Sequence, residues 1–372
     1  MVKLDIHDYD KNFNNKLKAF QDNESIDKRN RDLVSDFLND CALGKTIKHK
    51  AKKRIGSARR LRYLECLTDI IIWFNKPLDE VTQKDMERIV LNLENNKYTR
   101  KDKKYKGENY SSSTLYEYKK TIKKFYKWLL GNNDHYPDLV SWIENITVNT
   151  EIPALSRNEV EKLASRSSTQ LHKTLILFLF DAGTRIEETL NVKKSNLTRV
   201  VDKDKENPMA YYKIRIEYSK TKPRTIGVPM CTEVIDQWLE YSKPNDNDYL
   251  FPISYDAVRM FISRLGKEVL NKRVTAHILR HSSCTYYCTK LNHFQLCYRY
   301  GWSMKSNSPD RYIDREGLTD DEAPKQFKSD EIEKLRDENK TMKEEMKLMK
   351  ELINNTRNEI VEGYWRKKFK KT

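Results

Sequence analysis

The sequence predicts a mainly α-helical protein with a small β-hairpin, arranged as two domains followed by a C-terminal coiled coil. Three observations support this fold class. With 372 residues, the chain exceeds one ordinary domain and can bury two separate cores. Apolar residues recur every three or four positions through most of residues 25–145 and again from residue 156 onward. Over residues 209–230 the period changes to two, which is typical of paired strands.

The N-terminal part divides into an arm and a helical domain. Residues 1–24 are polar and charged, so we expect them to form a flexible arm. Residues 25–145 contain several amphipathic segments, and Thr82 with Asp85 has the pattern of a capping box at the start of one of them. The clearest apolar face belongs to the segment "RRLRYLECLTDIIIWF", with Leu61, Leu64, Leu67, Ile71 and Phe74.

A linker over residues 146–155 leads into a second domain, expected over residues 156–325. Ser156 and Glu159 form a second capping box at its start. The segment "HKTLILFLFDAG" predicts a buried helix that ends at Gly183, and "TRIEETLNV" predicts a short helix after it. The hairpin of residues 209–230 follows, and helical segments then resume.

Residues 328–360 have a heptad pattern that predicts a coiled coil. Asn339 falls at an a position, which favours a paired and in-register dimer, although a single helix docked on its own domain is the alternative. A basic tail, residues 361–372, ends the chain. The a and d positions are Ile332, Leu335, Asn339, Met342, Met346, Met349 and Ile353.

The charge balance predicts a polyanionic partner, a nucleic acid. The formal net charge is +16, and lysine and arginine are spread along the whole chain. Residues 45–62 are the densest basic stretch, with almost no acidic residue to neutralise it, so we expect phosphate contacts there. The candidate DNA-binding residues are Lys45, Lys48, Lys50, Lys52, Lys53, Arg54, Arg59, Arg60 and Arg62.

The sequence favours a cytoplasmic protein. Its first residues lack the apolar core of a signal peptide, and its longest apolar runs are far shorter than a membrane span. The six cysteines do not have the spacing of a secreted disulfide framework, so we expect them to be reduced.

The polar residues at the ends of elements suggest metal-free phosphodiester chemistry. Arginine forks such as Arg185 and Arg280 bind nonbridging phosphate oxygens and the charge that develops on them. A lysine or histidine can protonate a leaving 5′ oxygen. A tyrosine can attack phosphorus and conserve the bond energy in a phosphotyrosine. The candidate residues are Arg185, Lys220, Lys222, His277, Arg280, His281 and Tyr312.

In their order along the chain, these residues resemble the catalytic motifs of the tyrosine recombinases, the phage integrase family. "GTRIEETL" matches the first motif with Arg185 and Glu188, and "HILRH" matches the second with His277, Arg280 and His281. Lys220 best matches the hairpin lysine, with Lys222 as a substitute, and Tyr312 matches the nucleophile. Trp302 stands where the family usually has histidine, a position at which some members also use tryptophan.

The resemblance extends over roughly residues 25–325 and includes a helical, SAM-like core-binding domain over 25–145. The coiled coil lies outside the common core of the family and is similar to that of some archaeal integrases. In this resemblance Arg185, His277 and Arg280 hold the scissile phosphate, Lys220 is the acid, and Tyr312 forms a 3′-phosphotyrosine. Trp302 packs against Tyr312 or donates to phosphate, Glu188 orients Arg185, and His281 supports the helix of Arg280.

The resemblance also implies how the protein acts as a whole. It implies a nucleoid-associated site-specific recombinase, an integrase of a virus or mobile element, whose two domains clamp DNA. Four protomers would exchange strands without metal or cofactor, with the coiled coil as a possible dimerisation element.

Four other interpretations stay open at this point. A host chromosome-dimer resolvase and a type IB topoisomerase use the same tyrosine chemistry, and a recombinase-derived regulator would bind DNA without cleaving it. Zinc binding is the fourth, because His281, Cys284 and Cys288 share a helical face; the chain lacks a tight cysteine knuckle, so packed core cysteines are the alternative. His277, His293 and Cys297 lie in the same region.

Overall fold

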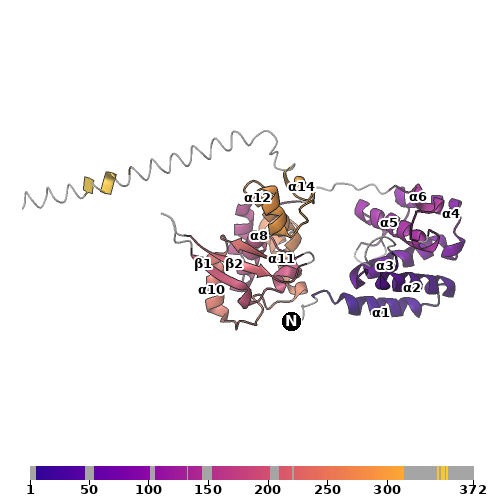
Figure 1. Cartoon of the computed structure of the whole chain (residues 1–372), viewed down its shortest axis with the longest axis horizontal. Coiled ribbons are helices and arrows are strands. Elements are labelled where there is room, and N and C mark those ends of the chain that lie inside the picture. The colour runs from indigo at the N-terminus through magenta and orange to yellow at the C-terminus, as the bar shows by residue number, and fades with distance from the viewer. Residues whose placement is uncertain are drawn as a thin grey trace, which may run out of the picture. The chain divides into compact units, whose positions relative to one another are not determined.

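A computed structural model of the chain describes residues 6–46, 54–100, 105–131, 133–144, 153–201, 209–219, 222–313, 342, 345–347 and 349–350. The described chain forms two compact units, and the principal boundary between them lies between residues 152 and 153. Figure 1 shows helices in both units and strands in the C-terminal unit. The predicted fold class, mainly α with a small β element, is confirmed.

The N-terminal unit is built from helices around one core. Phe37, Leu64 and Phe125 are completely buried at its centre. The predicted capping box at the start of α4 is confirmed, because the Thr82 amide donates to Asp85 Oδ2 over 3.1 Å. The helices are α1 Tyr9–Gln21, α2 Lys28–Leu43, α3 Ser57–Phe74, η1 Leu78–Glu80, α4 Gln83–Glu94, α5 Ser112–Leu129 and α6 Asp138–Ser141.

The prediction of a flexible arm over residues 1–24 is wrong for residues 9–21, which form α1. Phe13 and Phe20 of this helix are buried in the core, with Leu17 packed against it. These three residues are four and three positions apart and therefore lie on one helical face. The many charged residues between them mask this short apolar stripe, which is why composition alone suggested an arm.

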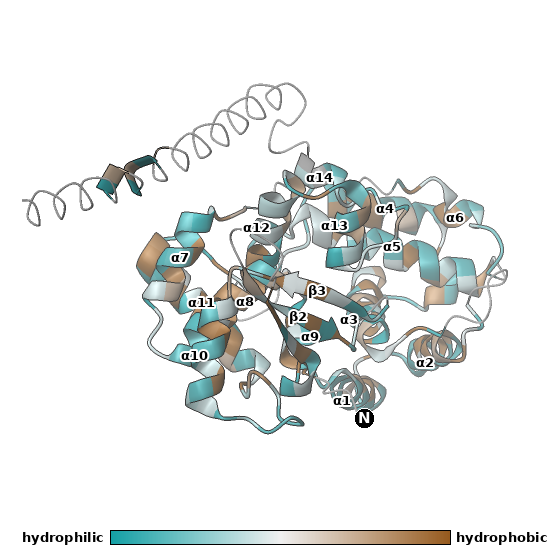
Figure 2. Cartoon of the chain, turned by 60° about the vertical axis from the view of Figure 1, so that its left-hand side comes forward, coloured by the Kyte–Doolittle hydropathy of each residue, from teal (hydrophilic) through white to brown (hydrophobic). Residues whose placement is uncertain are grey.

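The C-terminal unit combines nine helical segments with one small sheet in its described residues. Figure 1 shows the sheet beside α8 and α10, and the hydropathy colouring of Figure 2 shows hydrophilic and hydrophobic residues on α10. Its elements are α7 Arg157–Ser165, α8 Gln170–Ala182, α9 Ile186–Leu190, η2 Lys194–Asn196, β1 Leu197–Val201, β2 Ala210–Ile216, β3 Arg224–Val228, α10 Thr232–Ser242, α11 Tyr255–Leu270, α12 Ala276–Cys288, α13 His293–Tyr300 and α14 Asp310–Ile313.

The sheet has the order β1-β2-β3 and is antiparallel throughout. Strands β2 and β3 are the predicted hairpin, with Tyr212 opposite Val228 and Ile216 opposite Arg224. Strand β1 was not predicted. Its five residues do not alternate between buried and exposed positions, so they carry no period-two signal.

Several predictions lie mostly or wholly outside the described residues. These are the linker up to residue 152, the coiled coil of residues 328–360 and the basic tail of residues 361–372. Within the predicted coiled coil, Met342, Met346 and Met349 are described as helical with exposed side chains. Among the helices of the described part, none is long and apolar enough to cross a membrane.

Candidate active site

Arg185 is positioned by the sharp turn between α8 and α9. Helix α8 ends at Gly183, whose φ of 59° favours glycine. A Cβ on Gly183 would lie 2.3 Å from Cε1 of Tyr300, so close packing requires glycine as well. Two residues later, Arg185 occupies the N-cap of α9, and its side chain remains about one-third exposed. The guanidinium of Arg185 can therefore reach a ligand.

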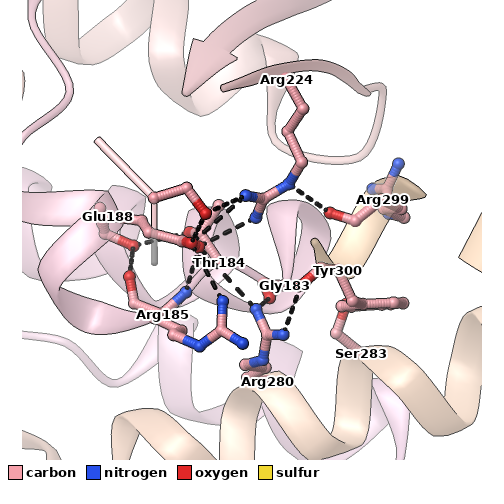
Figure 3. Close-up of polar contacts among 11 residues, drawn as sticks. Gly183, Thr184, Arg185, Glu188, Arg224, Arg280, Ser283, Arg299 and Tyr300 are labelled. Carbon is pink, nitrogen blue, oxygen red and sulfur yellow. Dashed lines mark hydrogen bonds and ion pairs between the residues drawn. The ribbon is translucent and has the colours of Figure 1, made fainter. Parts of the chain in front are cut away.

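Glu188 is the centre of the polar cluster around Arg185. Its Oε2 accepts from the backbone amide of Arg185 at 3.0 Å, and its Oε1 accepts from Nη1 of Arg185 at 3.1 Å. Arg224 and Arg280 approach Glu188 from opposite sides in the view of Figure 3. Burial alone would raise the pKa of Glu188, but hydrogen bonds and charge from Arg224 outweigh it and lower that pKa to about 2. Glu188 is therefore ionised.

Arg280 lies on α12 and joins three parts of the unit. Its Nη1 donates to the Gly183 carbonyl at 2.6 Å, and its Nη2 donates to the Tyr300 carbonyl at 2.7 Å. Nη1 also lies 3.9 Å from Oε2 of Glu188. Burial lowers the pKa of Arg280, and the charges of Arg185 and Arg224 lower it further. An anion beside these arginines would relieve their mutual repulsion.

His277 occupies the first turn of α12, which Thr275 caps by accepting from the Ile278 amide at 3.2 Å. Its side chain is exposed. Partial loss of hydration lowers the pKa of His277, and the positive charges of Arg280 and Arg185 lower it further. His277 is consequently neutral at pH 7 and can donate one hydrogen bond.

Tyr312 lies in α14 and is buried, with 7% of the residue exposed. Its hydroxyl forms a hydrogen bond with Nδ1 of His281. Trp302 stacks on the Tyr312 ring, with the centroids 5.8 Å apart and the planes 16° apart. The same indole centroid lies 5.9 Å from Cζ of Arg280. Trp302 thus joins the arginine cluster to the tyrosine.

The observed contact of His281 differs from the role predicted for this residue. The sequence assigned His281 to the support of the helix that carries Arg280, whereas the structure directs its ring toward the Tyr312 hydroxyl. His277 and His281 also form an edge contact, with their ring centroids 4.2 Å apart. Because His281 follows Arg280 directly on α12, its side chain points to a different side of the helix.

Two comparisons place this cluster in a known family. Residues 153–315 match the phage integrase family. Tyrosine recombinase XerA of Saccharolobus solfataricus is 27% identical over 233 residues, which span 60% of this chain and 70% of the relative. Residues 153–315 belong to the phage integrase family, that of the tyrosine recombinases.

Other similarities agree with this integrase-family domain. Transposase A from transposon Tn554 of Staphylococcus aureus is 27% identical over 158 residues, which span 36% of this chain and 41% of the relative. A lambda integrase dimer bound to a COC′ core site aligns over 77% of each chain, at 15% identity and a TM-score of 0.56. XerH bound to its difH substrate aligns over 80% of this chain and 98% of that chain, at 18% identity and a TM-score of 0.52. The two structures share the fold.

Arg224 belongs to the site of this integrase-family domain and was missed in the sequence. Its side chain is 2% exposed and pairs with Glu188 through Nη2 at 2.9 Å. A signal was present, because Arg224, Ile226 and Val228 alternate along β3 and all face the buried side. An arginine on a buried strand face needs a carboxylate partner, and Glu188 is that partner.

The two candidate lysines lie between β2 and β3. Lys220 is outside the described residues. Lys222 is described and exposed, two residues before the buried Arg224. The choice of Lys220 as the acid therefore stays a prediction.

The predicted DNA-binding stretch contains both exposed and paired cations. Lys48, Lys50, Lys52 and Lys53 lie outside the described residues, whereas Lys45 and Arg54 are exposed. Arg59 pairs with Glu117, Arg60 lies over the Phe13 ring, and Arg62 lies 3.4 Å from Glu65. The helix that begins at Ser57 therefore uses part of its basic charge within the unit.

The cysteines near α12 pack in the core. Cys284, Cys288 and Cys297 are all buried, and burial raises the pKa of the Cys284 thiol to about 12. Among the described residues, no group of three or more histidine, cysteine or acidic side chains is arranged to hold a metal ion.

Proposed function

We propose that this chain is a site-specific DNA recombinase, an integrase, that cuts and rejoins DNA through a 3′-phosphotyrosine formed by Tyr312. The observation that carries the proposal is the stacked Trp302–Tyr312 pair beside a cluster of three arginines and one carboxylate. Three guanidinium charges against one carboxylate leave this cluster a charge of +2 for a phosphate. The family of residues 153–315 supports the same reaction class.

The proposed reaction conserves the energy of the phosphodiester bond. Arg185, Arg280 and His277 bind the nonbridging oxygens, where charge accumulates as the bond to Tyr312 forms. The Tyr312 hydroxyl gives its proton to water as its oxygen attacks phosphorus, and the bond from phosphorus to the 5′ oxygen breaks. Lys220 supplies the proton that the leaving 5′ oxygen takes up, with Lys222 as its substitute. Attack by the 5′ hydroxyl of another strand then reverses these steps and releases Tyr312.

The contact between Tyr312 and His281 would hold the nucleophile back before DNA arrives. The Tyr312 ring is nearly buried and its hydroxyl is hydrogen-bonded, so it must leave His281 to reach a phosphate. The polar segment of residues 303–308 precedes α14, and most of its side chains are exposed. That segment can change conformation at little cost in buried apolar area.

The proposed partners are double-stranded DNA and further copies of the chain. The solved relatives include a lambda integrase dimer bound to a COC′ core site and a lambda integrase tetramer bound to a Holliday junction. A tetramer in which strands are exchanged in pairs fits the proposed chemistry. The predicted coiled coil of residues 328–360 would help to hold protomers together.

The test is a covalent adduct on a nicked duplex. The duplex sequence is one that the protein enriches from a random library, and the nick lets the short cleaved strand diffuse away and trap the adduct. We expect wild type to form the adduct in EDTA, because arginines supply the positive charge, and Tyr312→Phe to bind the duplex without an adduct. An adduct in Tyr312→Phe, or a strict requirement for Mg²⁺, would refute the assignment.

A further inference from the structure

Arg224 is buried, yet it contacts the main elements of the candidate site. It makes four hydrogen bonds: Nη2 to Glu188 Oε2 at 2.9 Å, Nη1 to Glu188 Oε1 at 3.2 Å, Nη1 to Ser219 Oγ at 3.1 Å and Nε to the Arg299 carbonyl at 2.9 Å. These contacts join β3 to α9, to the segment that follows β2 and to the end of α13. With only 2% of its side chain exposed, Arg224 cannot itself bind DNA.

The charges around Glu188 show what Arg224 contributes. Glu188 faces Arg185 on its own helix, Arg224 from β3 and Arg280 from α12. The two-pronged guanidinium contact belongs to Arg224, whereas Arg185 reaches Glu188 through only one guanidinium nitrogen and Arg280 lies 3.9 Å away. Arg224 therefore neutralises the carboxylate and leaves the charges of Arg185 and Arg280 available to a phosphate.

We propose that Arg224 is a positioning residue: it occupies Glu188 so that Arg185 and Arg280 keep their charge and their donors for the scissile phosphate. Ser219 completes the arrangement by donating to Glu188 Oε1 at 2.8 Å. The bond to the Arg299 carbonyl anchors the end of α13, which Arg280 also holds through the Tyr300 carbonyl. Trp302 follows two residues later, so the same arginine helps to fix the stacking partner of Tyr312.

This inference rests on the proposed function, and its first test is independent of cleavage. Phenylglyoxal labels the neutral form of an arginine, and mass spectrometry quantifies the label on Arg185. In Arg224→Met, Glu188 binds Arg185 more tightly, so labelling of Arg185 should slow roughly threefold, the order of magnitude that one partly exposed ion pair supplies. Inorganic phosphate should protect Arg185 in wild type and protect it less in the variant. In the double variant Glu188→Gln with Arg224→Met, the labelling rate of Arg185 and its protection by phosphate should both return toward the wild-type values.

The second test is the rate of adduct formation on the same nicked duplex. Arg224→Met should slow it by about 10²-fold, comparable to losing one donor to a developing oxyanion, with little change in duplex affinity. Adding Glu188→Gln should recover about tenfold, because the competing carboxylate is gone. If Arg224 were purely structural, the opposite result would be expected. Adding Glu188→Gln would then remove further hydrogen bonds and slow adduct formation more.

Arg299→Met is the matched control, because Arg299 is also buried and pairs with a different carboxylate, Asp181. Arg299→Met should leave Arg185 labelling unchanged. If it slows adduct formation, adding Asp181→Asn should not restore the rate. If Arg224→Met does not fold, the double variant decides: phosphate protection of Arg185 supports the proposal, and its loss overturns it. Unchanged Arg185 labelling in a folded Arg224→Met also overturns it. Absence of an adduct in wild type would refute the recombinase assignment alone, because labelling still decides the role of Arg224.

Discussion

In its described residues, the C-terminal unit contains two buried clusters of arginine and carboxylate, and they differ in charge balance. Glu188 is surrounded by three arginines, and its pKa is lowered to about 2 although burial opposes this. Asp181 has one arginine partner, Arg299 at 3.4 Å, and also accepts from the Tyr287 hydroxyl at 2.6 Å and the Cys231 amide at 3.0 Å. Burial raises the pKa of Asp181 in spite of these contacts.

We propose that this difference in charge balance separates a phosphate-binding site from a purely structural contact. The Arg299 side chain pairs with Asp181 and donates to the Gly227 carbonyl, so this cluster holds α8, β3 and α13 together. The Glu188 cluster keeps a surplus of two positive charges, and Arg185 remains partly exposed. Surplus charge at a partly open site is what phosphate binding requires, whereas a balanced and closed cluster only stabilises the fold.

The largest effect is expected from substituting Arg185, the partly exposed arginine of the Glu188 cluster. Arg185→Lys keeps one positive charge but loses the planar fork that matches two phosphate oxygens. We expect single-turnover cleavage to slow by about 10²–10³-fold. Arg199→Lys is the control, because Arg199 pairs on the surface with Asp236. Equal rates for the two variants would contradict a role for Arg185 at the phosphate.

The next expected effect is on stability at low pH, where Glu188 and Asp181 should contribute differently. Because the folded pKa of Glu188 is lowered from about 4.5 to about 2, its contribution is complete above pH 4.5 and is lost as the pH falls toward 2. The shift corresponds to about 3 kcal/mol of unfolding free energy. Glu188→Gln should therefore reduce the loss of stability between pH 5 and pH 2, measured by urea unfolding.

Asp181→Asn should change stability in the other direction. The raised folded pKa of Asp181 means that its ionisation opposes folding, so its contribution declines as the pH rises through its unfolded value toward its folded value. The substitution should remove that decline. A Glu188→Gln profile parallel to wild type, or identical profiles for the two variants, would show that the clusters do not differ as described.

The smallest effect concerns the basic stretch of the N-terminal unit. Arg54 is exposed, whereas Arg59 pairs with Glu117. If Arg54 contacts phosphate, Arg54→Ala should reduce the slope of log affinity against log salt by about one unit and weaken binding to all sequences. Arg59→Ala should change the slope less. A larger effect from Arg59 would show that its pair with Glu117 opens on DNA.

Much of the fold was predictable because the signals were local. The capping box of Ser156 and Glu159 forms as expected, with the Ser156 amide donating to Glu159 Oε2 at 2.9 Å, and Gly183 ends α8. The period-two segment became β2 and β3. Helix α1 was missed because its apolar stripe is short and interrupted by charge, and β1 was missed because it does not alternate.

The candidate site was predictable only in part. Arg185, Glu188 and Arg280 were identified by motif, and the structure brings them together. The pairing of Arg224 with Glu188 and the contact between His281 and Tyr312 depend on tertiary packing between elements. His281 and Tyr312 are 31 positions apart in the sequence. Sequence spacing does not encode such contacts, although the buried alternation of β3 marked Arg224 as a residue in need of a partner.

The most direct test of the central claim is to identify the residue that becomes joined to DNA. The trapped adduct is digested with nuclease and protease, and its peptides are sequenced by mass spectrometry. We predict a single modified peptide in which Tyr312 carries a 3′-linked phosphonucleotide. A phosphonucleotide on any other residue would contradict the account.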